Sequence, residues 1–265
     1  RLDGKLALVT GGGGDGLGAA ICERLAEHGA DVAVLDVSET AAATTVASIA
    51  GRWSATAELL VADVADREQV QTAVNGLVER RGGIDILVNN AGGSGSIGIQ
   101  GEKVSQHGPF DEMEIEDLLT VVRVNLLGLL MVTRLVLPHM LARGSGRVVN
   151  IASEGGKTAI PDLSVYNACK AGVIGFTRSL AAEVGSRGVT VVGVCPGIMV
   201  SNRTVRSLSD QKGRGFTSLD TAFSRVTLGR CTVVDEVAGV VAFLASEAGA
   251  FVHGTSVSLG GGMAD

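Results

Sequence analysis

No stretch of 18 or more uncharged, predominantly apolar residues occurs in this sequence of 265 residues, and its first residues lack the apolar core of a signal peptide. We therefore expect a soluble protein with no membrane partner, and we take the cytoplasm as its default location. Clusters of Lys and Arg are also missing, and the formal net charge is -6. Because binding to phosphate backbones needs such clusters, the sequence argues against a nucleic-acid partner.

Patterns for metals and disulfides are missing as well. The four cysteines lie far apart with no C-x-x-C pair, and the four histidines show no ligand spacing, so we expect neither a bound metal nor a disulfide. No Pro-rich or Ser-rich linker and no internal repeat divides the chain. With 46% hydrophobic and 19% charged residues it can bury a substantial core, which predicts a single domain over residues 1–265.

Apolar runs of strand length alternate with longer amphipathic stretches along the whole chain. Several of the strand-length runs are apolar throughout, as expected for a parallel sheet with helices on both faces. The fold class is therefore α/β, a doubly wound Rossmann-type domain with a parallel sheet of about seven strands flanked by helices. Strands are expected at 5–10, 31–36, 58–62, 84–89, 147–152, 189–194 and 256–259, and helices at 17–28, 39–49, 66–80, 111–142, 165–184 and 235–245.

Two segments do not follow this alternation and are expected to be variable loops. Residues 93–109 contain five glycines and no obvious element, and residues 201–225 carry five Lys or Arg against two Asp, a local balance of +3. Long loops in compact domains often serve as lids or binding loops. The positive balance hints at an anionic substrate, and the alternative explanation is a solvated lid.

The first predicted strand runs directly into a glycine-rich turn, and a predicted helix follows at once. Glycines let the chain turn sharply and let a pyrophosphate approach the backbone, while the helix N-terminus supplies N–H groups and partial positive charge. Asp36 lies 18 residues after Gly18, at the end of the second predicted strand, where a carboxylate can accept hydrogen bonds from the ribose hydroxyls of an adenosine. The context predicts a dinucleotide site.

Two other classes of protein also have a glycine-rich turn after the first strand, namely NTPases and methyltransferases. An ordinary NTPase is excluded, because no Lys followed by Ser or Thr comes after the last glycine. A methyltransferase that uses S-adenosylmethionine also has a glycine turn and an acidic residue after its second strand, so it remains the alternative from a different class. Asp36 favours NAD over NADP, since a 2′-phosphate at about 4 Å would be repelled by roughly 4 kcal/mol per charge pair at an effective dielectric of about 20.

The only tyrosine of the chain, Tyr166, lies four residues before Lys170, so a helix places both side chains on one face. A phenol is a poor base at neutral pH, but a nearby ammonium and a positively charged nicotinamide favour the phenolate, and Tyr166 then becomes a proton shuttle. Ser153 lies just past the end of the fifth predicted strand, where open α/β sheets place their chemistry. Glu154 beside it could contact a polar substrate or exclude an anionic one.

These residues, together with Asn89-Asn90-Ala91-Gly92 after the fourth predicted strand, resemble a short-chain dehydrogenase/reductase over nearly the whole chain. The family turn usually reads T-G-x-x-x-G-x-G. This chain restores the G-x-x-x-G-x-G spacing only when it is counted from Gly12 through Gly16 and Gly18, so its turn is one residue longer. The family commonly forms tetramers through its long helices, and the resemblance thus implies a homotetramer or homodimer.

The resemblance also implies the role of each matching residue. Tyr166 is the expected general acid/base, Lys170 holds the nicotinamide ribose and lowers the pKa of Tyr166, Ser153 binds the substrate oxygen, and Asn125 positions a water in a proton relay. The residues expected around the cofactor are Gly12, Asp15, Gly16, Leu17, Asp36, Asp63, Val64, Asn90, Ala91, Gly92, Tyr166, Lys170, Pro196, Ile198 and Ser201.

The function predicted from these residues is NAD-dependent hydride transfer between the nicotinamide and a secondary alcohol or ketone. The cofactor carries the hydride, and the protein positions the reactants and moves the hydroxyl proton. NAD preference favours oxidation of the alcohol. The alternatives are an NADP-dependent ketone or 3-oxoacyl reductase and a catalytically silent dinucleotide-binding protein. The motifs do not identify the substrate.

Overall fold

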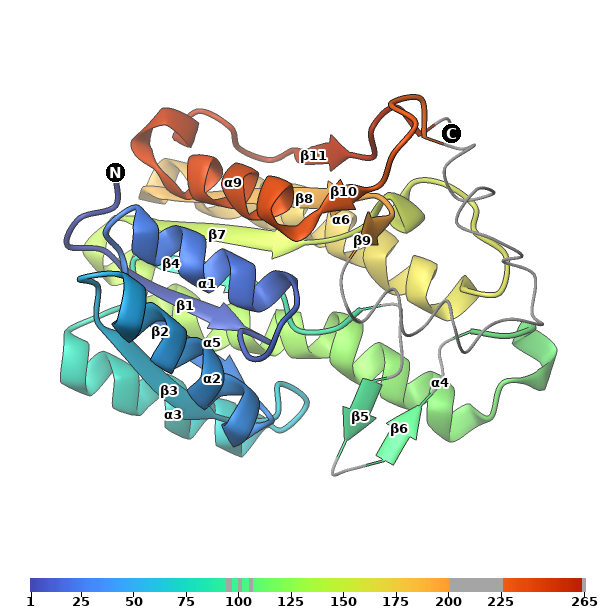
Figure 1. Ribbon diagram of the computed structural model, residues 1–265, viewed down its shortest axis with the longest axis horizontal. Coiled ribbons are helices and arrows are strands. Elements are labelled where there is room, and N and C mark those ends of the chain that lie inside the picture. Colours follow the sequence, from blue (N-terminus) through green and yellow to red (C-terminus); the bar gives the residue numbers. More distant parts are fainter. Residues whose placement is uncertain (94–96, 100–101, 105–106, 201–225, 264–265) are drawn as a thin grey trace.

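The structure is a computed structural model that describes residues 1–93, 97–99, 102–104, 107–200 and 226–263. Seven parallel strands form one sheet in the order β3-β2-β1-β4-β7-β8-β11, which confirms the predicted doubly wound fold (Figure 1). The chain order reverses between β1 and β4, which are neighbours in the sheet. The strands are β1 (Leu6–Thr10), β2 (Asp31–Asp36), β3 (Ala57–Val61), β4 (Ile86–Asn89), β7 (Gly146–Ile151), β8 (Val189–Pro196) and β11 (Ser256–Leu259).

Helices cover both faces of this sheet. In Figure 1, α1, α2 and α9 lie on one face, and α3, α5 and α6 lie on the other. Each face has its own cluster of buried aliphatic side chains, and β1 and β4 are buried along their whole length, which explains why they are apolar except for their last residues, Thr10 and Asn89. The helices are α1 (Leu17–Glu27), α2 (Glu39–Arg52), α3 (Arg67–Arg81), α4 (Ile115–Val122), α5 (Gly128–Arg143), α6 (Ser164–Val184) and α9 (Val234–Ala245).

Helix capping explains why several predicted boundaries are accurate. The Ser38 hydroxyl accepts a hydrogen bond from the Ala41 N–H (3.2 Å) at the start of α2. The Asp66 carboxylate accepts from the backbone N–H groups of Glu68 and Gln69 at the start of α3. These interactions satisfy donors that the first helical turn leaves unpaired. By contrast, the cap of α1 is Gly16, which has no side chain to play this role.

The single helix predicted over 111–142 is corrected by the structure. It is divided into α4, a π-helical turn (Arg123–Leu127) and α5. The continuous run Ile115–Arg143 is long and apolar enough to cross a membrane by composition, with 44% of its most apolar window buried. Its contacts with α3, α6, β4 and β7 account for that composition as the covering layer of a sheet.

The segment 93–109 contains an element that the sequence did not reveal. Strands β5 (Ile97–Ile99) and β6 (Glu102–Val104) pair as a short antiparallel hairpin, which Figure 1 shows outside the main sheet. A second small pairing joins β9 (Met199–Val200) to β10 (Thr232–Val233) just past the end of β8. The other variable segment, 201–225, lies outside the described residues.

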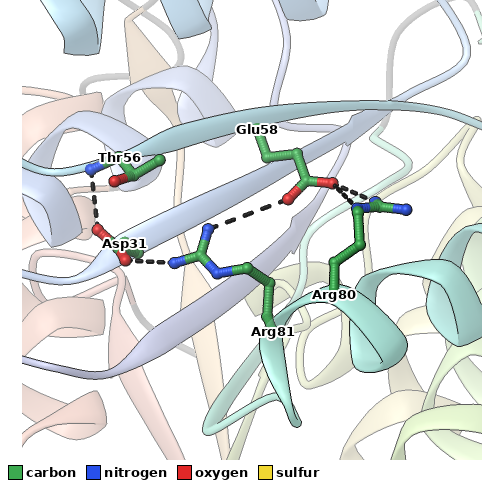
Figure 2. Close-up of polar contacts among 5 residues, drawn as sticks. All are labelled: Asp31, Thr56, Glu58, Arg80 and Arg81. Atoms are coloured by element: carbon green, nitrogen blue, oxygen red, sulfur yellow. Dashed lines mark hydrogen bonds and ion pairs between the residues drawn. The ribbon is translucent and has the colours of Figure 1, made fainter.

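The amino ends of β2 and β3 are tied to the last turn of α3 by a charged cluster (Figure 2). Arg81 pairs with Asp31, Arg80 pairs with Glu58, and the Asp31 carboxylate also accepts a hydrogen bond from the Thr56 N–H (2.8 Å). This cluster lies at the opposite edge of the sheet from the carboxyl ends of the strands. It anchors the end of α3 to the sheet, and it is remote from the predicted site residues at the carboxyl edge.

Candidate functional site

Every predicted site residue in the described part of the chain lies at or beyond the carboxyl ends of the strands, or on a helix that borders them. The glycine turn follows β1, Asp36 ends β2, Ser153 follows β7 and Pro196 ends β8. In an open parallel sheet this edge forms the ligand-binding crevice, at the position where the strand order reverses. Ser201 is the one predicted site residue that lies outside the described residues.

The glycine turn after β1 is closed by contact between two glycines. A Cβ atom added to Gly18 would lie 1.9 Å from the Gly11 carbonyl oxygen, and Gly11 itself has a φ of +61°. Beyond this contact, the backbone at Gly16 opens to free space, with no heavy atom within 4 Å of an added Cβ. Helix α1 therefore begins at an accessible glycine that has no side chain with which to cap it, which fits a pyrophosphate.

The members of the turn differ in position. Gly12 is buried beneath it, with an added Cβ 3.0 Å from both the Cys22 sulfur and a Val34 methyl group. Gly16 and Leu17 are partly exposed, and Asp15 is exposed. The accessible part of the turn is thus its second half.

Asp36 is held in place by two backbone groups. One carboxylate oxygen accepts a hydrogen bond from the Gly13 N–H (3.0 Å), and the other accepts from the Ser38 N–H (2.9 Å). Gly13 is packed closely against Ala41 and Ala42 of α2. The lengthened turn therefore packs against α2 at Gly13, and the Gly13 N–H orients the Asp36 carboxylate.

Asn90 joins the carboxyl ends of β1 and β4. Its side-chain amide donates to the carbonyl oxygens of Thr10 (3.1 Å) and Gly11 (3.0 Å). The Thr10 hydroxyl accepts from the N–H groups of Asn90 (3.0 Å) and Ala91 (3.1 Å). Asn90 thus has a structural role that the sequence analysis did not assign. Thr10 has no site role in the predictions, although it stands at the end of a strand beside the glycines.

The remaining cofactor candidates border the same edge. Asp63 follows β3 and accepts a hydrogen bond from the Ala65 N–H (2.8 Å), while Val64 packs against Gly128 of α5. The Gly92 backbone lies against the Asn125 side chain. Pro196 pairs with Leu259 of β11, and the Ile198 carbonyl accepts from the Thr232 N–H (3.1 Å).

Tyr166 and Lys170 lie one turn apart on α6, as predicted, and both are buried, with 7% and 3% exposure. The Lys170 Nζ is 5.7 Å from the centre of the Tyr166 ring and donates a hydrogen bond to the Ile151 carbonyl (2.9 Å). Ser153 is extended, and its Oγ accepts from the Gly155 N–H (3.1 Å). These side chains come together beyond the end of β7.

Burial dominates the titration of this pair. Burial raises the pKa of Tyr166 to about 12, although its hydrogen bond with the Ser153 side chain lowers it. Burial also lowers the pKa of Lys170 to about 8. The resemblance implies that Lys170 lowers the pKa of Tyr166. In the protein alone, desolvation of the phenolate is the larger effect, and a positively charged nicotinamide is the remaining group that favours the phenolate.

Asn125 lies in the π-helical turn between α4 and α5. Its side-chain oxygen accepts a hydrogen bond from the Gly93 N–H (2.9 Å), and its amide donates to the Val121 carbonyl (3.2 Å). Asn125 is 1% exposed, because the wider turn directs it inward. This contact connects the α4–α5 junction to the segment after β4.

A buried polar chain behind the site was not predicted. The Asn89 amide donates to Asn150 (2.8 Å) and Thr133 (2.9 Å), and the Asn150 amide donates to Thr177 (3.0 Å). It connects two adjacent strands to α5 and α6. An asparagine within each of two otherwise apolar strands was the available signal, since a buried amide needs partners.

Comparison with known proteins agrees with this arrangement. A family model described as short chain dehydrogenase matches residues 5–212. The chain belongs to this family. It is similar to the 3-oxoacyl-acyl-carrier-protein reductase FabG of Thermotoga maritima, at 35% identity with 99% of each chain covered. It is also similar to D-threitol dehydrogenase of Mycolicibacterium smegmatis, at 34% identity with 99% of this chain and 94% of that one covered. The solved structure of an NAD+-bound xylitol dehydrogenase superposes with a TM-score of 0.89 at 30% identity, covering 99% of this chain and all of that one.

This short-chain dehydrogenase is therefore an oxidoreductase that acts on CH–OH groups or the corresponding ketones and binds a nicotinamide dinucleotide. The main prediction and its reductase alternative both fit these relatives. The accessible N-terminus of α1 and the carboxylate at the end of β2 are the two features from which the sequence predicted a dinucleotide site.

The closed glycine turn generates a first prediction. Gly18→Ala should lower the free energy of unfolding by about 2 to 3 kcal/mol, because its methyl group would overlap the Gly11 carbonyl. It should also weaken NADH binding. Urea unfolding and NADH fluorescence titration measure the two effects. In the matched control Gly51→Ala, on the exposed side of α2, no described heavy atom lies within 4 Å of the new methyl group, so NADH binding should stay near that of the wild type. Its free energy of unfolding should stay the same or rise by up to about 1 kcal/mol, because alanine has the higher helix propensity. Equal stability of the two variants would contradict this account of the turn.

The buried lysine generates a second prediction. The pKa of Lys170 is about 8 when folded and near 10.5 when unfolded, so the unfolded chain binds more protons between these values, and stability rises with pH there. Relative to Lys170→Met, the free energy of unfolding of the wild type should increase by about 2 kcal/mol from pH 8 to pH 10. Tyr166 stays protonated in this window. Urea unfolding at both pH values tests this, and a pH-independent difference would show that Lys170 titrates normally.

Proposed function

We propose that this enzyme oxidises a secondary alcohol to a ketone with NAD as the hydride acceptor, and that Tyr166, Lys170, Ser153 and Asn125 form its catalytic group. The observation that supports this most directly is the convergence of Ser153, Tyr166 and Lys170 at the carboxyl end of β7, with the phenol in hydrogen-bond contact with the serine. Bound nicotinamide supplies the electrophilic carbon that accepts the hydride.

The residues of this chain perform the proton chemistry. Ser153 holds the substrate hydroxyl oxygen, and Tyr166 accepts the hydroxyl proton as the C–H hydride leaves the same carbon, so that the C–O bond becomes a carbonyl. The Lys170 ammonium favours the phenolate. It is held by the Ile151 carbonyl, which fixes its position relative to the phenol. Asn125 binds the Gly93 N–H and so holds the segment after β4 beside these catalytic residues. It also positions a water for the proton relay.

We also propose NAD as the preferred cofactor. Among the described residues, the Asp36 carboxylate accepts hydrogen bonds from backbone groups only, and no cation pairs with it to balance a 2′-phosphate. Both carboxylate oxygens keep lone pairs for ribose hydroxyls, since an ionised carboxylate accepts at about four sites. The names of two relatives, D-threitol dehydrogenase and xylitol dehydrogenase, fit the direction of oxidation. The FabG relative keeps an NADP-dependent reductase as the second candidate.

We further propose a homotetramer or homodimer assembled through the α4–α5 region. Ile115, Leu119 and Leu127 expose 62%, 43% and 44% of their surface in the single chain, and they lie along one continuous helical run. Exposed aliphatic side chains along one helical run favour contact with a second copy.

The catalytic assignment predicts that Tyr166→Phe lowers kcat for alcohol oxidation by about 10² to 10⁴, because the variant keeps the ring but loses the proton acceptor. NADH binding should persist. The measurement is nicotinamide absorbance over a panel of secondary alcohols, with Thr44→Val, which removes an exposed hydroxyl from α2, as the control. Undiminished turnover by Tyr166→Phe would disprove its role, and a wild type that binds NADH but turns over nothing would favour the silent dinucleotide-binding alternative.

The cofactor assignment predicts that wild type has a higher kcat/KM with NAD than with NADP. Asp36→Ala should shift the ratio toward NADP by at least about 10-fold, because it removes the charge that repels a 2′-phosphate. Asp31→Ala is the matched control, since Asp31 lies at the other end of the same strand in the cluster of Figure 2. A wild type that prefers NADP would overturn this proposal and favour the reductase alternative.

A further inference from the structure

Glu154, the residue after Ser153, is a buried carboxylate that lacks the partners such a group normally has. Its side chain is at the start of a short 3₁₀ turn (Glu154–Gly156), and the residue is 5% exposed. Within the described residues, its buried Oε1 has no hydrogen-bond partner. The nearest lysine in sequence, Lys157, donates instead to the Ser258 hydroxyl (2.6 Å) and the Ser256 carbonyl (3.3 Å).

Glu154 is buried at the carboxyl edge of the sheet, beside the residues that follow β11. Its Cγ and Cδ lie 3.1 Å and 3.2 Å from a Cβ built on Gly260, which follows β11. An added Cβ at Gly197, the residue after Pro196, would in turn lie 2.9 Å from the Gly260 Cα. The carboxyl group is therefore enclosed by the carboxyl ends of β7, β8 and β11, at the same edge as Ser153. Glycine at position 260 leaves the space that the carboxyl group occupies.

The hydrogen-bonding chemistry of the Glu154 carboxylate indicates which ligand it would bind. An ionised carboxylate accepts hydrogen bonds and donates none, so a buried oxygen without a donor is costly. A substrate hydroxyl can supply the missing donor in a charge-assisted bond. Ser153 and Glu154 both lie at this edge of the sheet, and we therefore assign the two groups that they bind to neighbouring parts of one substrate. A carboxylate or phosphate at that position would instead be repelled.

We propose that Glu154 is a substrate-binding residue that accepts a hydrogen bond from a second hydroxyl group, on the carbon next to the carbinol that Ser153 holds. The preferred substrates are then vicinal diols or polyols, and anionic 2-hydroxy acids are discriminated against. This proposal rests on the proposed alcohol oxidation. It adds a specificity determinant to that function.

Three probes with a four-carbon skeleton test the assignment: 2-butanol, 2,3-butanediol and 2-hydroxybutyrate. Wild type with NAD should have its highest kcat/KM for the diol. Glu154→Gln should lower kcat/KM for the diol by about 10- to 100-fold, the value of one hydrogen bond to a charged group. It should change kcat/KM for 2-butanol by less than about 2-fold and raise that for 2-hydroxybutyrate, since the repulsive charge is gone.

The matched control is Glu183→Gln, which makes the same change at an exposed position near the end of α6 and should leave all three values unchanged. NADH titration and thermal unfolding of each variant separate specificity from folding. Equal losses of kcat/KM for the diol and for 2-butanol in Glu154→Gln would assign Glu154 a structural role and overturn the proposal. Unchanged kcat/KM values for both substrates in this variant would also overturn it. A wild type that binds NADH but does not favour the diol would overturn it as well. Failure to bind NADH would contradict the proposed function itself and is read separately. If 3-amino-2-butanol surpasses the diol, the donor is an amine and the hydroxyl assignment is overturned.

Discussion

The junction between the carboxyl ends of β1 and β4 is the constraint on which the site depends. Thr10 and Asn90 connect the two strands, and the Asn90 amide also reaches the carbonyl of Gly11, against which Gly18 closes. These contacts fix where α1 begins, and hence where its N-terminus points. Because the sheet order reverses here, the connections that leave β1 and β4 lead to helices on opposite faces of the sheet, and such a divergence forms a crevice for a ligand.

The site combines groups that burial penalises. Lys170 and Glu154 are almost completely buried. A charged side chain without a partner is less stable in such a site than in water. Lys170 is compensated only in part, by one carbonyl, and burial shifts its pKa toward neutrality. The buried Oε1 of Glu154 has no compensation within the described residues. The two apolar clusters on the faces of the sheet stabilise the fold and so offset the cost of burying Lys170 and Glu154. The site therefore depends on the stability of the core.

Local signals predicted most of the fold. The ranges of β2 and β11 agree with the sequence prediction at both ends, and the helices that begin after Ser38 and Asp66 do so because those side chains cap them. What the sequence did not predict depends on tertiary contact. The π-helical turn that directs Asn125 inward has no propensity signal, and the β5–β6 hairpin lies in a segment rich in glycine.

The candidate site shows the same division. Spacing on a helix predicted that Tyr166 and Lys170 share a face, since this follows from helix geometry alone. It did not predict that burial would raise the pKa of the phenol, because desolvation depends on how the surrounding helices enclose it. Likewise, Asn90 was expected beside the cofactor, whereas its hydrogen bonds to Thr10 and Gly11 are evident only once β1 and β4 are adjacent.

The lengthened glycine turn shows how a local irregularity can support a function. The lengthened turn keeps the close contact of Gly18 with Gly11 and the accessible backbone at Gly16. Its Gly13 N–H binds one oxygen of Asp36, while the Ser38 N–H binds the other. A carboxylate held by two backbone donors from different segments cannot rotate away from a ligand without breaking one of them. Its charge is therefore preorganised against a 2′-phosphate, and discrimination between the two cofactors becomes a property of the backbone as much as of the aspartate.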